Sequence, residues 1–187
     1  MREGELLGLT WDNVDLKNCK ITVKQQLKRD SKIGEKNSQY ILADTKTGNH
    51  RILTVDPSVI QRIKREKARQ AQNKLRLGSD YKNEKNLVFT NDYGRFINPR
   101  VLLKAFKKRL AAVGLPSTMR IHDLRHTFAT QSFHNGDSVV EVQTNMGHTQ
   151  ASTTLNVYAH CTEEMNTNSV RRMGEFIKSL NLDEKAE

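Results

Sequence analysis

The sequence has few cysteines, no long apolar run and a low share of apolar residues. Its two cysteines, Cys19 and Cys161, form no CxxC pair, which excludes a disulfide framework and a cysteine zinc site. No stretch approaches the ~20 consecutive apolar residues that a membrane helix needs. The first residues include acids where a secretion signal carries an apolar run. We therefore expect a cytoplasmic protein with no membrane partner.

The chain is strongly basic for its size. It has 187 residues, of which 36% are apolar, and its 31 Lys and Arg against 21 Asp and Glu give a net charge of +10. A length near ~150 residues favours one domain, and a large positive excess favours a polyanionic partner. The basic residues are scattered through mixed-charge segments and form no single basic amphipathic helix, so nucleic acid is a better partner than a membrane.

Alternation of polar and apolar residues predicts the strands. One small antiparallel sheet is expected from three of them, at Lys20–Leu27, Tyr40–Leu42 and Arg51–Val55. The polar segment 45–50 contains a Gly-Asn step and is expected to turn a hairpin between the second and third strands. A further short apolar strand is predicted at Leu87–Thr90.

Start and stop signals predict the helices. Asp56-Pro57 and Asn98-Pro99 each pair an N-cap with proline at the first helical position. The expected helices run over residues 5–9, 57–77, 99–113, 123–133, 138–146, 152–160 and 163–180. The predicted fold class is therefore mainly α with a small antiparallel β-sheet, an α+β arrangement.

The densest functional signal is the segment 121–130. His122 and Arg125 are three residues apart, so on a helix they project from one face. An imidazole beside a guanidinium suits a clamp for one phosphate. Taken alone, the HxxR spacing also fits a capped helix with an incidental histidine and arginine.

The rest of the sequence adds to this pair. His148 directly follows Gly147, Tyr158 follows ten residues later, and Arg2 stands at the start of the first predicted helix. In this order the residues resemble the tyrosine recombinase family, the phage and transposon integrases, whose catalytic domain shows R…K…HxxR…GH…Y. The resemblance covers almost the whole chain.

The resemblance implies a catalytic site and a reaction. The site residues that it implies are Arg2, Lys46, His122, Arg125, His148 and Tyr158. The implied activity is site-specific DNA recombination, in which a tyrosine attacks a phosphodiester to give a 3′-phosphotyrosine and a free 5′-hydroxyl. Another strand's hydroxyl then reseals the break without ATP, metal or cofactor. The implied partners are double-stranded DNA and further copies of the chain, in a tetrameric synapse.

The chemistry explains why these residue types are needed. Two guanidiniums, Arg2 and Arg125, can hold phosphate oxygens bidentately. The Tyr158 hydroxyl, with an ordinary pKa of about 10, needs a proton acceptor, for which His122 is the natural candidate. Lys46 resembles the family's general acid for the departing 5′-oxygen, and His148 is expected to hydrogen-bond the phosphate.

The sequence also departs from the family pattern. We expect residues 1–187 to be a single catalytic domain, without the family's preceding core-binding domain, and residues 163–187 to form a C-terminal helix and tail. This last helix either folds back on its own domain or, as the family implies, docks on a neighbouring subunit. The residues 143–146 are polar except for Met146, where the family has an apolar pair and leucine; this bears on local helix packing more than on catalysis.

Two other functions fit parts of the sequence. A metal phosphohydrolase could use His122, Asp123, His126 and His148 to hold a divalent cation, but this leaves the arginines and the tyrosine unexplained. A DNA-binding module without catalysis would show salt-sensitive binding and no covalent protein–DNA product.

Overall fold

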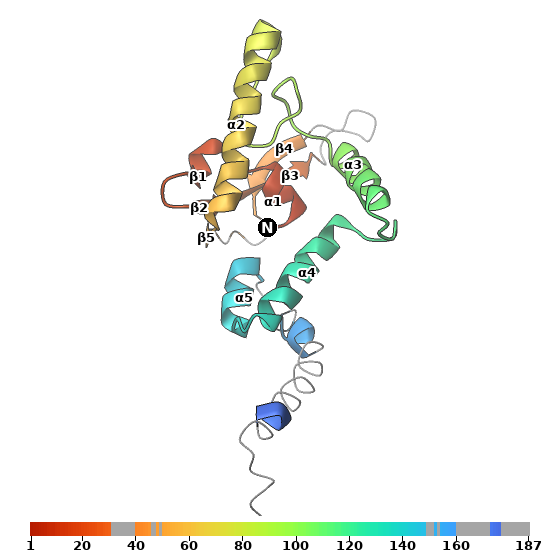
Figure 1. Ribbon diagram of the computed structural model, residues 1–187. Helices are drawn as coiled ribbons and strands as arrows, with labels where there is room; N and C mark the ends of the chain where they lie inside the picture. The colour runs from red at the N-terminus through yellow and green to blue at the C-terminus, as the bar shows by residue number, and fades with distance from the viewer. Residues whose placement is uncertain are drawn as a thin grey trace, which may run out of the picture. The chain divides into compact units, whose positions relative to one another are not determined.

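The computed structural model describes residues 1–30, 40–45, 48, 50–148, 152, 154–159 and 173–176. The chain divides into two compact units, Met1–Arg125 (unit 1) and His126–Glu187 (unit 2). Unit 1 contains all the strands that the structure describes and helices α1 to α3, and unit 2 is helical (Figure 1). The predicted fold class, mainly α with small antiparallel sheets, is confirmed.

Unit 1 contains two small sheets where the sequence predicts one. Strands β1 (Val14–Asp15), β2 (Lys20–Val23) and β5 (Arg51–Thr54) form an antiparallel sheet in the order β1-β2-β5. Strands β3 (Gln25–Arg29) and β4 (Tyr40–Asp44) pair separately, also antiparallel. The predicted strand 20–27 is therefore divided at Lys24.

A jump in register separates the two sheets. Val23 pairs with Arg51, whereas Gln25 pairs with Asp44. Lys24 alone joins β2 to β3, whereas residues 45–50 join their respective partners, β5 and β4. Because β4 pairs with β3 and β5 pairs with β2, the prediction of a hairpin between β4 and β5 is wrong. The alternation of residues continues through Lys24, so the sequence gives no sign of this change of partner.

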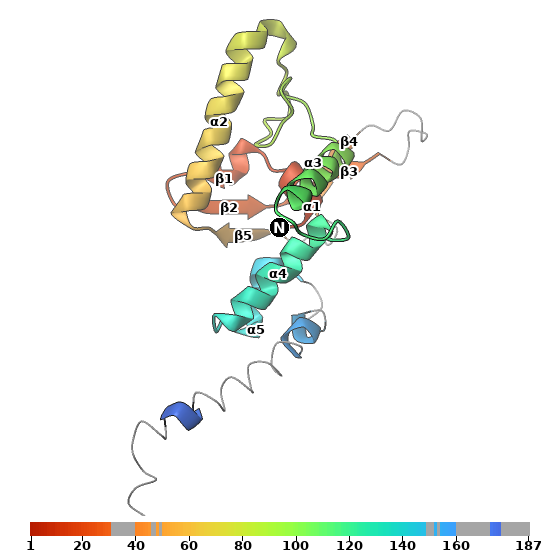
Figure 2. The ribbon, with the colours of Figure 1, turned by 45° about the vertical axis from the view of Figure 1, so that its right-hand side comes forward.

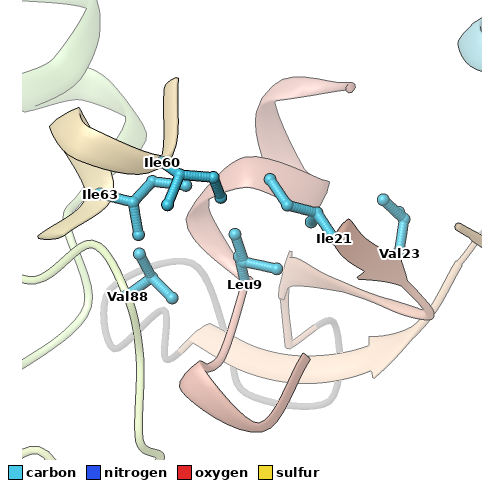
Figure 3. Close-up of a cluster of buried hydrophobic side chains, with 6 residues drawn as sticks. All are labelled: Leu9, Ile21, Val23, Ile60, Ile63 and Val88. Atoms are coloured by element: carbon cyan, nitrogen blue, oxygen red, sulfur yellow. The ribbon is translucent and has the colours of Figure 1, made fainter. Parts of the chain in front are cut away.

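The core of unit 1 joins the sheet to helix α2 (Pro57–Leu77). This helix has the predicted bounds, and the Asp56 side chain accepts a hydrogen bond of 2.8 Å from the Ser58 N–H. Its apolar side packs onto β2 and the segment after α1, as Figure 3 shows. The core cluster consists of Leu9, Ile21, Val23, Ile60, Ile63 and Val88. The C-terminal half of α2 extends beyond the sheet (Figures 1 and 2).

The segment after α2 is irregular, and the strand predicted at Leu87–Thr90 is wrong. Leu87 and Thr90 make only isolated bridges, with Thr10 and Phe96. The side-chain amide of the buried Gln70 donates to the carbonyls of Leu87 and Val88 at 3.1 and 2.7 Å. A helix side chain thus supplies hydrogen bonds that a neighbouring strand would otherwise give, and this pins α2 to the segment.

Two helices complete unit 1 and lead out of it. Helix α3 (Pro99–Ala112) begins after Asn98, whose side chain accepts from the Arg100 N–H at 2.9 Å. Of its apolar residues Leu110 is buried and Val101 is exposed. Helix α4 (Ile121–His134) begins two residues before the predicted start and passes from unit 1 into unit 2.

Unit 2 packs α4 against α5 (Val139–Met146). Its core cluster contains Ala129 and Phe133 from α4 and Val142 and Met146 from α5. Ser138 and Glu141 form a capping box, and the helix ends at Gly147 with a left-handed φ of 63°. Residues 154–159 and 173–176 are helical; the rest of the helix predicted at 163–180 lies outside the described residues.

The long helices of the described part are not membrane spans. Helix α2 has the length to cross a bilayer, but it carries too many charges, and no other described helix is both long and apolar enough.

Candidate active site

Arg2 is held at the start of α1 (Glu3–Leu7) by a buried glutamate. The Glu5 carboxylate accepts from the Arg2 backbone N–H at 2.7 Å and from Arg2 Nη1 at 2.9 Å. Arg51, on β5, donates to both oxygens of the same carboxylate, through Nη1 at 3.2 Å and Nη2 at 2.7 Å. The Glu5 side chain is only 1% exposed. One carboxylate therefore fixes two guanidiniums from different elements.

The electrostatics of Glu5 favour its charged form. Burial acts to raise the pKa of this carboxyl, but the hydrogen bonds from Arg51 and from Arg2, together with the charge of Arg51, lower the pKa to about 2. Glu5 is thus ionised at neutral pH and serves as the internal counterion of the arginines.

Arg125 brings a third guanidinium into the same electrostatic environment. It lies on α4 and is buried, with 6% of the residue exposed. Burial, and then the charge of Arg2, lower its pKa to about 10, with a smaller effect from Arg51 and an opposing one from Glu5. Arg125 stays protonated at neutral pH, so among the described residues of unit 1 three guanidiniums experience the charge of the Glu5 carboxylate. Unit 1 thereby holds a cluster with excess positive charge, suited to an anion.

His122 lies one turn before Arg125 on α4, and it is exposed. Its neighbour Asp123 is engaged at the helix start, where the carboxylate accepts from the Arg120 N–H at 2.8 Å and from Arg120 Nη2 at 2.9 Å. Within the described residues no three His, Cys, Asp or Glu side chains are grouped to hold a metal. The four residues of the metal-hydrolase alternative therefore form no ligand set there.

In unit 2 a buried hydroxyl orients His148. The Nδ1 atom of His148 lies 2.8 Å from Thr154 Oγ1, and Thr154 is 1% exposed. The backbone of His148 is held by Gln143, whose side chain donates to the His148 carbonyl at 3.3 Å. The polar Gln143, which departs from the family pattern, thus has a structural role, while Val142 and Met146 fill the core.

Tyr158 lies one helical turn after Thr154, in the helical residues 154–159. Its ring packs edge-on against the buried Phe133 of α4, with centroids 5.2 Å apart and an angle of 72° between the ring planes. Tyr158 is 36% exposed, so the phenol is anchored by its ring and partly accessible. Unit 2 therefore links His148, Thr154 and Tyr158 through one short segment.

Lys46 lies outside the described residues. Its neighbour Thr45 is buried, and its backbone N–H donates to the Lys24 carbonyl at 3.4 Å. The Gly48 N–H donates to the Thr45 carbonyl at 2.9 Å. The role predicted for Lys46 stays a prediction.

The structure also reveals site residues that the sequence did not suggest. Glu5 and Arg51 complete the arginine cluster, and Thr154 orients His148. The Arg2–Glu5 spacing is a usable signal, because a glutamate three residues after a helix start is typical of a capping box. Arg51 carries no such signal, since its position depends on the pairing of β5 with β2.

Comparison with known proteins places these residues in a family. The model of the phage integrase family matches residues 1–165. The chain therefore belongs to the phage integrase family, that of the tyrosine recombinases, and the resemblance seen in the sequence is confirmed.

Individual relatives agree with this assignment. A protein named tyrosine recombinase XerC-like from Caldanaerobacter subterraneus subsp. tengcongensis is 36% identical over 182 residues, covering 94% of this chain and 46% of the relative. The integrase of Staphylococcus phage L54a is 24% identical over 181 residues, 95% of this chain and 49% of the relative. The chain thus spans about half the length of these relatives.

Solved structures show the same fold. The Tn1549 transposon integrase, in complex with a circular intermediate DNA, matches with a TM-score of 0.70 and 26% identity, over 92% of this chain and 54% of that one. The XerA recombinase matches in fold with a TM-score of 0.64 and 22% identity, over 90% of this chain and 53% of that one.

Proposed function

We propose that this chain is the catalytic part of a site-specific DNA recombinase that works through a tyrosine nucleophile. The observation that carries the proposal is the cluster of Arg2, Arg51 and Arg125 around Glu5, which leaves excess positive charge where a phosphodiester needs charge stabilisation. The family membership supports it. On this proposal the two units together make one catalytic domain, which acts on double-stranded DNA in the cytoplasm.

The proposed reaction conserves the phosphodiester bond. The Tyr158 oxygen loses its proton to His122 and attacks the phosphorus, while Arg2 and Arg125 hold the non-bridging oxygens. The bond between phosphorus and the 5′-oxygen breaks, and that oxygen takes a proton from Lys46 to leave as a hydroxyl. A 5′-hydroxyl from another strand then attacks the 3′-phosphotyrosine and releases Tyr158. The balance needs no ATP, metal or cofactor.

His148 has a supporting role in this scheme. Because Thr154 fixes the ring through Nδ1, we assign Nε2 as the atom that donates to the phosphate. Strand exchange between two duplexes requires four such sites, so the proposal includes a tetrameric synapse of this chain on DNA.

Covalent capture tests the proposal without a known target sequence. The 187-residue chain is incubated with a randomised duplex library that carries nicks, so that short cleaved strands diffuse away and trap the adduct. Protein-linked DNA is recovered under denaturing conditions and sequenced. We expect adducts of one sequence class with the wild type and none with Tyr158→Phe, which keeps the ring that packs on Phe133. Adducts that persist in Tyr158→Phe would refute the nucleophile.

The captured sequence then allows a test of Lys46. If Lys46 is the general acid, Lys46→Ala cleaves ordinary DNA slowly, and replacing the bridging 5′-oxygen by sulfur restores the rate, because a thiolate leaves without a proton. Single-turnover cleavage at saturating protein measures both substrates, with His122→Ala as the control that sulfur should not rescue. Equal defects of Lys46→Ala on the two substrates would remove Lys46 from this role.

The alternative of a DNA-binding module without catalysis is separated by the same experiment. It predicts salt-sensitive DNA binding and no covalent product from the wild type.

A further inference from the structure

Helix α2 carries most of the net charge of the chain. Over Pro57–Leu77 it contains seven Lys or Arg residues and a single acid, Glu66. This one helix therefore accounts for six of the ten net positive charges. None of these residues belongs to the candidate active site.

The arginines and lysines of α2 are sorted onto different sides of the helix. At 100° per residue, the spacing of three, four and seven residues puts four arginines on one side, which we call the arginine face: Arg62, Arg65, Arg69 and Arg76. The three lysines fall on the other side, where Lys67 Nζ lies 5.3 Å from the centroid of the Trp11 ring. The buried residues Ile63, Gln70 and Asn73 lie between these two sides.

The acids that border the arginine face are already paired. Arg69 donates to Glu66 through Nε at 3.0 Å, to Asp92 through Nη1 at 2.9 Å and to the Thr90 carbonyl at 2.7 Å. Arg69 thus anchors the face to the segment after α2. Arg62, Arg65 and Arg76 are exposed, and among the described residues no carboxylate forms a salt bridge with them.

Helix stability does not explain this arrangement. Arg62 and Arg65 are like charges three residues apart, which destabilises a helix. The N-cap carboxylate of Asp56 already interacts with the positive end of the helix dipole, and the arginines lie too far along the helix to add to that effect. The concentration of arginine is instead what a polyanion requires, because the planar guanidinium fork fits phosphate oxygens where an ammonium acts only as a point charge.

We propose that the arginine face binds the phosphate backbone of duplex DNA, at a position separate from the phosphate held in the active site. Arg62 and Arg76 are about 21 Å apart along the helix at 1.5 Å per residue, enough to reach phosphates on both sides of a major groove about 12 Å wide. The C-terminal half of α2 extends away from α1, the helix that begins after Arg2 and contains Glu5 (Figures 1 and 2). Because phosphate contacts carry no sequence information, this contact is independent of the recombination sequence. The proposal uses the proposed function only in taking DNA as the partner.

The test compares two double variants that remove the same charge. Arg62→Gln with Arg65→Gln removes two positive charges from the arginine face, and Lys17→Gln with Lys20→Gln removes two from exposed positions near the β1–β2 turn. Affinity for a 60-base-pair duplex of random sequence is measured by fluorescence anisotropy across a salt series. Circular dichroism checks that both variants are folded, and we expect the arginine variant to be at least as stable as the wild type.

Each lost phosphate contact lowers the slope of log K against log salt by about 0.9. We therefore expect the arginine variant to lose a slope of about 1.8 and to bind roughly tenfold or more weakly at low salt, with the lysine variant close to wild type. An unchanged slope in the arginine variant, or equal losses in both variants, would overturn the proposal.

Covalent capture separates this proposal from the proposed function. At saturating protein the arginine variant should still form the Tyr158 adduct, because its cluster at Glu5 is intact. A difference in salt slope with no adduct from any protein would refute the recombinase mechanism alone. Adduct formation with equal slopes would refute the α2 contact alone.

Discussion

Glu5 allows the guanidiniums of the site to be held together in the absence of DNA. Its carboxylate accepts from both Arg2 and Arg51 and lowers the repulsion that Arg125 experiences. We predict that Glu5→Gln lowers the free energy of unfolding by about 3 kcal/mol, because removing one partner leaves buried charges uncompensated. Urea denaturation at neutral pH measures the loss.

The matched control for this prediction is Glu3→Gln in the same helix. The pKa of Glu3 is raised by burial, and no hydrogen bond from an arginine to its side chain is found in the described structure, so its ionised form contributes little. The control should change stability far less than Glu5→Gln. Equal effects would mean that the helix, and not the arginine cluster, depends on the carboxylate.

Thr154 is a positioning residue for His148. We predict that Thr154→Val slows covalent adduct formation by roughly 10- to 100-fold, because small misplacements of a catalytic group cost about that much. DNA affinity should stay unchanged. Single-turnover cleavage and anisotropy measure the two effects. Thr154→Ser keeps the hydroxyl and should recover most of the rate; failure of this rescue would indicate that the methyl group, not the hydrogen bond, matters.

The residues to which we assign catalysis were proposed from the sequence, whereas their partners could be predicted only in part. His122 and Arg125 share a helix face, and His148 follows a helix-ending glycine, so local spacing places them. Arg51 and Thr154 act through contacts whose geometry depends on strand pairing and on a helix turn. Local spacing does not encode such contacts.

Helix α1 approaches β3 so closely that a methyl group does not fit between them. A Cβ at Gly8 would lie 2.6 Å from the Leu27 backbone nitrogen and 2.8 Å from the Gln26 carbonyl carbon. We predict that Gly8→Ala destabilises the protein by about 1–3 kcal/mol and slows cleavage, because α1 carries Arg2. Thermal unfolding and single-turnover cleavage measure both effects.

Gly174 offers a control of the same chemistry. It is helical, and a Cβ there meets no described atom within 4 Å. Gly174→Ala should be neutral or stabilise the protein slightly, since alanine favours a helix over glycine. Unchanged stability in Gly8→Ala would contradict the close approach of α1 and β3.

The elements that were predicted well are those whose limits depend on local chemistry. Helix α2 has its predicted bounds because Asp56, Pro57 and Gly78 act within one turn of its ends. The strand predicted at 87–90 fails because Gln70, far away in sequence, bonds to its carbonyls. The division of the strand at Lys24 could not be predicted for the same reason, because it depends on pairing with strands from other parts of the chain.

The lowered pKa of Glu5 makes a distinct contribution to the pH dependence of the stability of the whole molecule. Folding lowers this pKa from its ordinary value of 4.5 to about 2, so the ionised form stabilises the fold. That stabilisation is complete above pH 4.5 and is lost as the pH falls towards 2. We predict that the difference in stability between the wild type and Glu5→Gln shrinks over this interval, as measured by thermal unfolding at a series of pH values.

The titration of other carboxyls does not affect this difference in stability between the wild type and Glu5→Gln. Asp15, Asp56 and Glu141 also have lowered pKa values, from hydrogen bonds with Asn18, Ser58 and Ser138. They are present in both proteins, so their contributions cancel in the difference. A difference that stays constant down to pH 2 would contradict the depressed pKa of Glu5.

The register jump at Lys24 has a consequence for how this family member can change over evolution. Both strands that flank residues 45–50 are already paired elsewhere, β4 with β3 and β5 with β2. Residues can therefore be added to or removed from this connection without sliding either sheet by one position. The connection that contains Lys46 can therefore vary in length from one family member to another while the strand that carries Arg51 keeps its register. On the proposed mechanism, the position of the lysine and the arginine cluster are then separately adjustable.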